Sequence, residues 1–222
     1  MPWPMVHFGI AVQLYNGQPS PSFLLGSIAP DAIHTRGHVT REEKGATHFV
    51  TGGRFPTIAE LEQACVNELG KRGEMDRADF VLGYIAHVYA DIRWTDTIYA
   101  SFERAYEDGK QGRIIRNVYN EEMAQTEFNL LRTKAWSDEI LDALRRAEID
   151  GLEPLVSEHE VSLYREMKLD YLSEPSHEPK IESVYFTDEA VLAFIARTAE
   201  ELKLLFVEWE VADISVPGAA SI

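Results

Sequence analysis

The stretch from residue 76 to residue 106 is the longest part of the sequence that can form one unbroken helix. It contains no proline and a single glycine, Gly83, and its apolar residues fall on every face of a helical wheel. A helix that is apolar on all sides is normally covered by other elements. We therefore expect an all-α protein, a single multi-helix domain built around this long, buried central helix.

Helical patterns cover most of the remaining chain. One of them begins with Thr57 and Glu60, at the spacing of a capping box. A turn or helix start is expected at Pro30. Strand patterns are scarce, with one short candidate at 183–187. The other expected helices are residues 6–15, 57–69, 112–133, 137–147, 156–171 and 187–210.

The composition marks no domain boundary, because no repeat or low-complexity tract divides the chain. We expect one metal-binding domain over residues 1–222. Within it, residues 35–56 are rich in glycine, threonine and charge and are expected to form an irregular loop. Residues 216–222 are expected to form a loose tail.

The formal net charge of −16 limits the partners that the chain can bind. Residues 1–75 carry 7 acidic and 6 basic side chains, whereas residues 76–222 carry 30 and 15. Nucleic acids and anionic membranes are bound through clustered lysine and arginine, so neither is an expected partner. Polar chemistry is expected in the near-neutral first part, which holds four of the seven histidines.

The cysteine content and the apolar runs indicate the compartment. Cys65 is the only cysteine, which excludes a disulfide framework and a Cys-x-x-Cys metal site. The first residues lack the basic and apolar regions of a signal peptide. No apolar run reaches the roughly 18 residues that a transmembrane helix needs. We expect a soluble, cytoplasmic protein.

His87 and Asp91 stand four positions apart in the central helix, so their side chains share one face. A carboxylate buried there requires a cation or strong hydrogen bonds. The pair is typical of a metal site. The alternatives are an ion pair, or a core histidine bonded to a backbone carbonyl.

Three residues in the first quarter of the chain can supply further ligands. His7 lies among apolar residues, Asp31 follows the turn at Pro30, and His48 ends the polar loop. The alternatives are a core histidine for His7 and a first-turn carboxylate for Asp31. Together with His87 and Asp91, these residues form the nitrogen and oxygen ligands that zinc accepts.

The ordered set of these residues resembles the zinc-dependent phospholipase C family, within the broader phospholipase C and nuclease-like superfamily. The resemblance lies within residues 1–100. It implies an all-helical, intracellular and divergent member with one zinc ion bound by Asp31, His48, His87 and Asp91, and His7 as a ligand of a neighbouring ion. The motifs are the early His7, FLLGSIAPD with Asp31, THF with His48, and FVLGYIAHVYAD with His87 and Asp91.

The family places further histidines after its H-x-x-x-D pair, whereas this chain has none between His87 and His159. We therefore expect one or two zinc-like ions, another divalent metal being an alternative. On an ideal helix Asp96 points about 180° away from His87, so it joins the site only if the helix breaks near Arg93. Additional ligands or supporting residues are expected among His38, Asp96, Glu122 and Glu127.

Enzymes of this family cleave phosphate esters with a water that the metal activates. The resemblance therefore implies a phosphoesterase, with His87, Asp91 and Asp31 at its catalytic centre. The expected substrate is a small phosphoester or a phospholipid headgroup. Arg36 could anchor the phosphate, because its fork suits phosphate oxygens, with His34 beside it. Two alternatives stay open, a metal-binding or structural helical protein without turnover, and a helical interaction domain.

Overall fold

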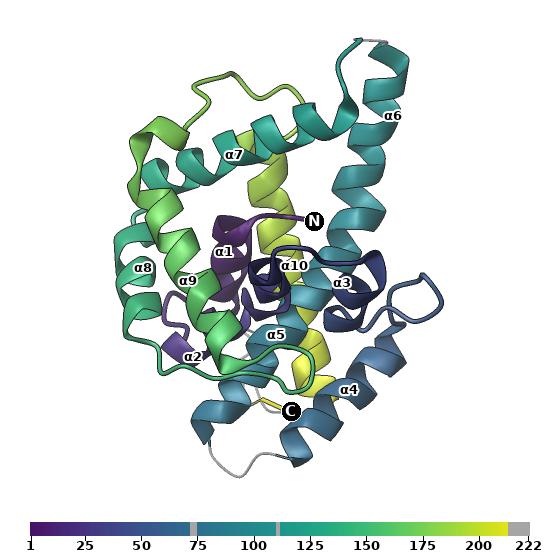
Figure 1. Ribbon diagram of the computed structural model, residues 1–222, viewed down its shortest axis with the longest axis vertical. Helices are drawn as coiled ribbons and strands as arrows, with labels where there is room; N and C mark the ends of the chain where they lie inside the picture. The colour runs from purple at the N-terminus through teal and green to yellow at the C-terminus, as the bar shows by residue number, and fades with distance from the viewer. Residues whose placement is uncertain (72–74, 110–111, 213–222) are drawn as a thin grey trace, which may run out of the picture.

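The computed structural model describes residues 1–71, 75–109 and 112–212, and in this part of the chain it contains ten α-helices and no β-strand (Figure 1). The predicted central helix is present. It runs as α5 (Met75–Trp94), passes through a π-helical turn, η2 (Thr95–Tyr99), and continues as α6 (Ala100–Gly109). The prediction of a single all-α domain is confirmed.

Five of the described helices begin at a serine or threonine whose side chain caps the first turn. The predicted capping box is present at the start of α4 (Ile58–Gly70), and Thr40 with Glu43 forms another that begins α3 (Arg41–Thr47). The prediction of an irregular loop over 35–56 is therefore wrong where this short helix forms. The remaining elements are α1 (Pro4–Leu14), α2 (Pro21–Gly26), η1 (Ala29–Arg36), α7 (Ile115–Thr133), α8 (Ser137–Arg146), α9 (Glu158–Ser173), η3 (Pro175–His177) and α10 (Asp188–Glu208). The five capped helices are α2, α3, α4, α9 and α10.

Residues 183–187 form no strand, which corrects the sequence prediction. The backbone amides of this segment bond to a side chain instead of a neighbouring strand. Those of Tyr185 and Phe186 donate to the buried carboxylate of Glu122, at 2.8 and 3.0 Å. The predicted loose tail at 216–222 lies outside the described residues.

Helices α2 and α5 cross in very close contact, and two glycines make this possible. A Cβ atom at Gly83 of α5 would lie 2.2 Å from the carbonyl oxygen of Phe23, and one at Gly26 of α2 would lie 2.1 Å from that of Phe80. Real side chains do not approach backbone so closely, so only glycine fits at either position. The crossing brings the end of α2 against the face of α5 that carries His87.

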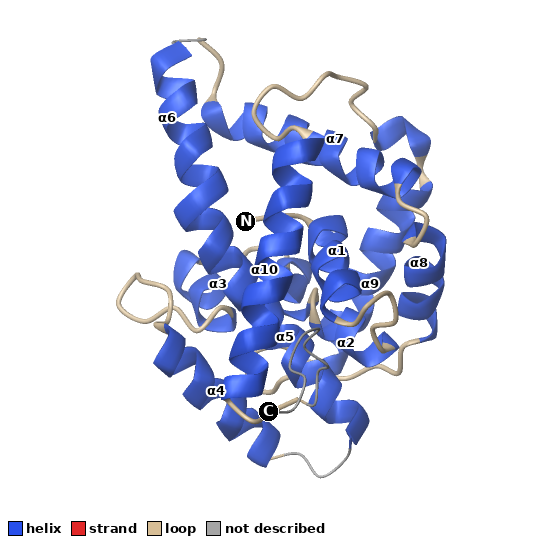
Figure 2. Ribbon diagram, turned by 180° about the vertical axis from the view of Figure 1, so that it is seen from behind, coloured by secondary structure: helices blue, strands red, loops and turns tan. Residues whose placement is uncertain are grey.

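The remaining helices enclose the crossing. Helix α1 packs against α10, and η1 packs against α9. Figure 1 shows α7 across one end of the molecule, α8 and α9 along one side, and α4 on the other side. In the view from behind, α10 passes in front of the interior (Figure 2). No helix in the described ranges combines the length and the apolar character that a membrane span requires.

Candidate metal centre

Five polar side chains from four elements meet beside α5. His7 comes from α1, Asp31 from η1, His48 from the C-cap of α3, and His87 and Asp91 from α5 itself. The side chain of Asp31 is 14% exposed, and the other four are buried. Asp31, His48 and His87 offer ligand atoms within 4.8 Å of one another, and so do His7, His87 and Asp91. The protein thus contains buried histidine and aspartate groups that could hold a metal ion.

The distances between these atoms match the edges of a small coordination polyhedron. His48 Nε2 lies 3.3 Å from His87 Nε2 and 3.7 Å from Asp31 Oδ1. Asp91 Oδ2 lies 3.2 Å from His48 Nε2 and 3.6 Å from His87 Nε2. Ligands about 2.0–2.1 Å from a tetrahedral zinc ion are about 3.4 Å apart. The four distances scatter around this value, so neighbouring ligand atoms are close enough to share a metal ion.

Backbone carbonyls fix which nitrogen of each histidine faces the centre. His87 Nδ1 lies 2.8 Å from the carbonyl oxygen of Ser27, and His48 Nδ1 lies 3.1 Å from that of Lys44. A carbonyl oxygen can only accept, so His87 Nδ1 carries the proton. A proton on His48 Nδ1 is favoured as well, because the Thr47 hydroxyl that lies 2.9 Å from this nitrogen already donates to the carbonyl oxygen of Lys44. In the neutral rings both Nε2 atoms then present lone pairs to each other across 3.3 Å. This orientation is the one that metal-binding histidines adopt.

Four buried atoms at the centre have no hydrogen-bond partner among the described residues. They are His7 Nε2, Asp31 Oδ1 and both carboxylate oxygens of Asp91. Buried polar atoms are normally satisfied, and carboxylates are the most costly to leave without partners. A positive group placed between these atoms would satisfy all four. The donor set therefore fits a metal cation.

Electrostatics keep most of the centre in the forms that bind a metal. Burial would raise the pKa of Asp91, but His87 and His48 outweigh it and hold that pKa below its ordinary value. The pKa of Asp31 is lowered in the same way. Burial, helped by the nearby His87, lowers the pKa of His7 to about 3, and burial also lowers the pKa of His87.

His48 behaves differently from the other two histidines. Burial would lower its pKa, but the carboxylates of Asp91 and Asp31 outweigh burial and raise the pKa above its ordinary value. A proton on His48 would occupy the side of the ring that faces the centre. Binding of a metal there is therefore expected to release this proton, because the ligand must be deprotonated.

His7 occupies the far side of the centre. Its ring stacks on that of His87, with 4.1 Å between centroids, and its Nε2 lies 3.9 Å from Asp91 Oδ1. The two oxygens of Asp91 therefore face different partners, Oδ2 toward His48 and Oδ1 toward His7. This geometry suits a carboxylate shared between two neighbouring positions.

The two residues expected to contact substrate lie at the rim. His34 Nε2 is 3.6 Å from Asp31 Oδ1, and its side chain is 43% exposed. Arg36 is engaged within the protein, because its Nε and Nη2 donate to the carboxylate of Glu160 and its Nη2 also donates to the carbonyl oxygen of Leu155 at 2.9 Å. Two of the three guanidinium nitrogens of Arg36 are therefore engaged within the protein.

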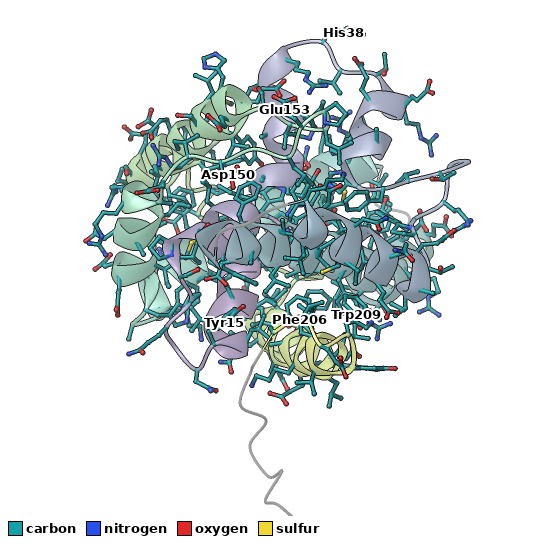
Figure 3. The ribbon with its side chains drawn as sticks, turned by 90° about the horizontal axis from the view of Figure 1, so that it is seen from below. Tyr15, His38, Asp150, Glu153, Phe206 and Trp209 are labelled. Atoms are coloured by element: carbon teal, nitrogen blue, oxygen red, sulfur yellow. The ribbon has the colours of Figure 1, made fainter. Side chains whose placement is uncertain are left out.

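The four residues expected as additional ligands are not brought to the centre. His38 is exposed on a loop at the edge of the molecule (Figure 3). The helix does change to π geometry just after Arg93, but Asp96 is exposed. Glu122 is bonded to the loop before α10, and Glu127 Oε1 accepts the backbone N–H of Met5 at 2.9 Å. Neither ligand group includes any of the four.

Glu127 leads to a prediction about pH. Burial raises its pKa to about 8, while a free glutamate titrates near about 4.3. Between these values the folded protein keeps a proton that the unfolded chain has lost, so stability falls by about 1.4 kcal/mol per pH unit as the pH rises. Glu127→Gln removes this dependence and keeps an oxygen acceptor for Met5.

We compare the free energy of unfolding of the variant with that of the wild type. The difference between them should shift in favour of the variant by about 2–3 kcal/mol when the pH is raised from 5.5 to 7.5. Urea denaturation of both proteins at the two pH values measures the gain. A difference that stays constant over this range would contradict a buried, protonated Glu127.

Three supporting residues escaped the sequence prediction. Ser27 and Lys44 act through backbone carbonyls, which leave no trace in residue type. Burial on α9 raises the pKa of the Tyr164 hydroxyl, and Tyr164 lies close enough to Asp31 for that carboxylate to raise this pKa further, although it is far along the chain. Of these contacts, only that between the Lys44 carbonyl and His48 has a local sequence pattern, a spacing of four residues. The pattern is informative only when helix α3 is known to cover this segment.

A pocket of about 820 Å³ opens at the centre, with His48 in its lining. Its charged residues are Arg41, Lys44 and Glu42, and the side chains of Val50 and Phe55 add apolar surface. The pocket thus reaches the centre at His48, the one of the five residues that lines it among the described residues.

Comparison with protein-family models, with curated proteins and with solved structures finds no match to this chain. The fold and the site alone define the class, an all-helical protein with buried histidine–aspartate groups that could bind a metal ion. The resemblance to zinc-dependent phospholipases C rests on the sequence motifs alone.

Proposed function

We propose that the protein is a metal-dependent hydrolase of phosphate esters, with a zinc-like ion held by Asp31, His48, His87 and Asp91. The observation that carries the proposal is the set of buried histidine nitrogens and aspartate oxygens that lie 3.2–3.7 Å apart around His48 and His87. His7 with Asp91 Oδ1 is proposed to bind a second ion or to support the first. The proposed substrate is a small phosphoester or a phospholipid headgroup.

An ion at this position supplies, when bound, Lewis acidity and a water acidic enough to ionise near neutral pH. The chain itself orients the site. The carbonyl oxygens of Ser27 and Lys44 hold the two Nε2 atoms toward the centre. Two basic residues at the pocket, Arg41 and Lys44, favour the approach of an anion to a protein that is otherwise strongly acidic.

The only cysteine supports hydrolysis by water over covalent catalysis by a thiol. Cys65 is fully buried, and burial raises its pKa to about 12. A thiol in this state stays protonated at neutral pH and does not attack a substrate.

Hydrolysis of a chromogenic phosphodiester by the zinc-loaded protein tests the proposal. We expect turnover in the wild type and a loss of at least about a thousandfold in His87→Ala, because several kcal/mol of transition-state stabilisation depend on the ion. His159→Ala is the matched control, since His159 is exposed on α9, and it should keep wild-type activity.

Activity that survives His87→Ala would refute this mechanism. A zinc-loaded wild type that hydrolyses no phosphoester would favour the alternative, a metal-binding or structural protein without turnover. That alternative gains support from the few ligands that face the second position, His7 and one oxygen of Asp91.

A further inference from the structure

Lys44 contacts residues of the candidate metal centre through both its backbone carbonyl oxygen and its side-chain ammonium. Its carbonyl oxygen lies 3.1 Å from His48 Nδ1 and also accepts the hydroxyl of Thr47 at 2.9 Å. Its ammonium lies 3.1 Å from His34 Nε2. Because the ammonium can only donate, that nitrogen of His34 accepts, and it cannot also donate to Asp31 Oδ1, which lies 3.6 Å away.

The ammonium of Lys44 differs from the guanidinium of Arg36 in what holds it. The carboxylate of Glu160 binds the guanidinium of Arg36. Within residues 1–71, 75–109 and 112–212, the one partner recorded for the Lys44 ammonium is the neutral acceptor of His34. Lys44 is half-buried, so part of its hydration has already been removed. The ammonium forms no ion pair in these ranges, although its charge helps to lower the pKa of Asp31, so its N–H groups can still bind an anion that enters the pocket.

The pocket beside Lys44 shows what kind of anion fits. Arg41 and Lys44 outnumber Glu42, the sole acid in the lining. Val50 and Phe55 form an apolar part, and the remaining lining includes three glycines, at positions 45, 52 and 53, which leave room. The volume of about 820 Å³ falls in the range of pockets that hold small organic ligands.

We infer that Lys44 is the phosphate-binding cation of this pocket, and that the substrate is a phosphate ester with an apolar or aromatic organic group that lies on Phe55 and Val50. This inference rests on the proposed function and makes it more specific. It assigns the phosphate to Lys44 rather than to Arg36. An ammonium is a compact charge that suits a phosphate approaching a metal ion from one side.

Binding of inorganic phosphate to the zinc-loaded protein, measured by titration calorimetry, tests the assignment without any turnover. Lys44→Gln should weaken phosphate binding at least about tenfold, and Lys44→Arg should restore most of it. Zinc content should stay at the wild-type level in both variants, since His48 is held by the backbone carbonyl of residue 44. Lys71→Gln is the matched control, because Lys71 is an exposed lysine paired with Glu68.

Two further arms address the rival anchor and the organic group. Arg36→Gln should bind phosphate like the wild type. Phe55→Ala should bind inorganic phosphate normally but should raise KM severalfold for phenyl phosphate, and less for a short-chain phospholipid whose headgroup carries the phosphate. A KM for phenyl phosphate that is unchanged in Phe55→Ala would overturn the contact between the organic group and Phe55.

The outcomes separate the two proposals. Phosphate binding that is unchanged in Lys44→Gln, or that is lost in Arg36→Gln instead, would overturn the role of Lys44 while leaving hydrolysis intact. Phosphate binding that depends on Lys44 in a protein that hydrolyses no ester would support the role of Lys44 and refute the hydrolase. A zinc-loaded wild type that binds no phosphate would overturn the inference outright.

Discussion

Replacing Asp91 with asparagine should weaken metal binding at least about 100-fold while leaving the fold intact. Asp91 is the fully buried residue whose two oxygens face His48 on one side and His7 on the other. Removing even a partner of a metal ligand costs about 10–100-fold in affinity, so the loss of a ligand itself should cost at least about 100-fold. The amide keeps the shape of the side chain, which separates lost ligation from lost packing.

Thermodynamic linkage gives this prediction a measurable size. At a zinc concentration of about 100 times Kd, the metal should stabilise the wild type by about 2.7 kcal/mol. With Kd raised about 100-fold, the same zinc should stabilise Asp91→Asn by only about 0.4 kcal/mol. Urea denaturation with and without zinc measures both increments, and metal analysis of the dialysed proteins gives the stoichiometry.

Glu122→Gln is the matched control for this experiment. Glu122 is also a buried helical carboxylate, but its Oε2 is satisfied by the backbone amides of Tyr185 and Phe186. Its neutralisation should lower stability by about 1–2 kcal/mol, because hydrogen bonds to a charged group become neutral ones. The zinc increment should stay that of the wild type. Equal zinc increments in Asp91→Asn and Glu122→Gln would contradict the site.

The second large effect is expected at the crossing of α2 and α5. Gly83→Ala would place a Cβ atom 2.2 Å from the carbonyl oxygen of Phe23 and 2.9 Å from the backbone nitrogen of Ser27. Both obstacles are backbone, so the helices must separate. We expect a loss of about 3 kcal/mol in the free energy of unfolding without metal. Metal affinity should fall as well, because the same displacement moves the carbonyl oxygen of Ser27 away from His87.

Gly70→Ala is the control for this substitution. Gly70 is the last residue of α4, and a Cβ atom there would meet no heavy atom within 4 Å. Alanine should raise stability by up to about 1 kcal/mol through its higher helix propensity. Urea denaturation of the two variants measures the contrast. A Gly83→Ala protein as stable as the wild type would show that the crossing tolerates a side chain and does not hold the site in place.

The elements that local pattern decides were predictable from the sequence. The central helix follows from a long stretch without proline, and the box at Thr57 and Glu60 marks the start of α4. The shared face of His87 and Asp91 follows from their spacing of four. Helix α3 was missed because it is short and polar, although Thr40 and Glu43 already spell its capping box.

What the local pattern could not supply was the set of contacts between distant segments. Asp31 and His87 lie 56 positions apart, and their approach depends on the glycine crossing of α2 and α5. Arg36 looked free in the sequence, but Glu160, on a helix far along the chain, pairs with it. The sequence does not indicate a role for Lys44, because a lone lysine in a polar segment usually faces solvent.

The central claim is that Asp31, His48, His87 and Asp91 hold one metal ion. The most direct test is a crystal structure of the zinc-loaded protein, with anomalous diffraction measured at the zinc absorption edge. The account predicts an anomalous peak at about 2.0–2.2 Å from His48 Nε2, His87 Nε2 and an oxygen of each aspartate. A well-ordered structure without such a peak, with a proton-bridged pair of His48 and Asp91 in its place, would contradict it.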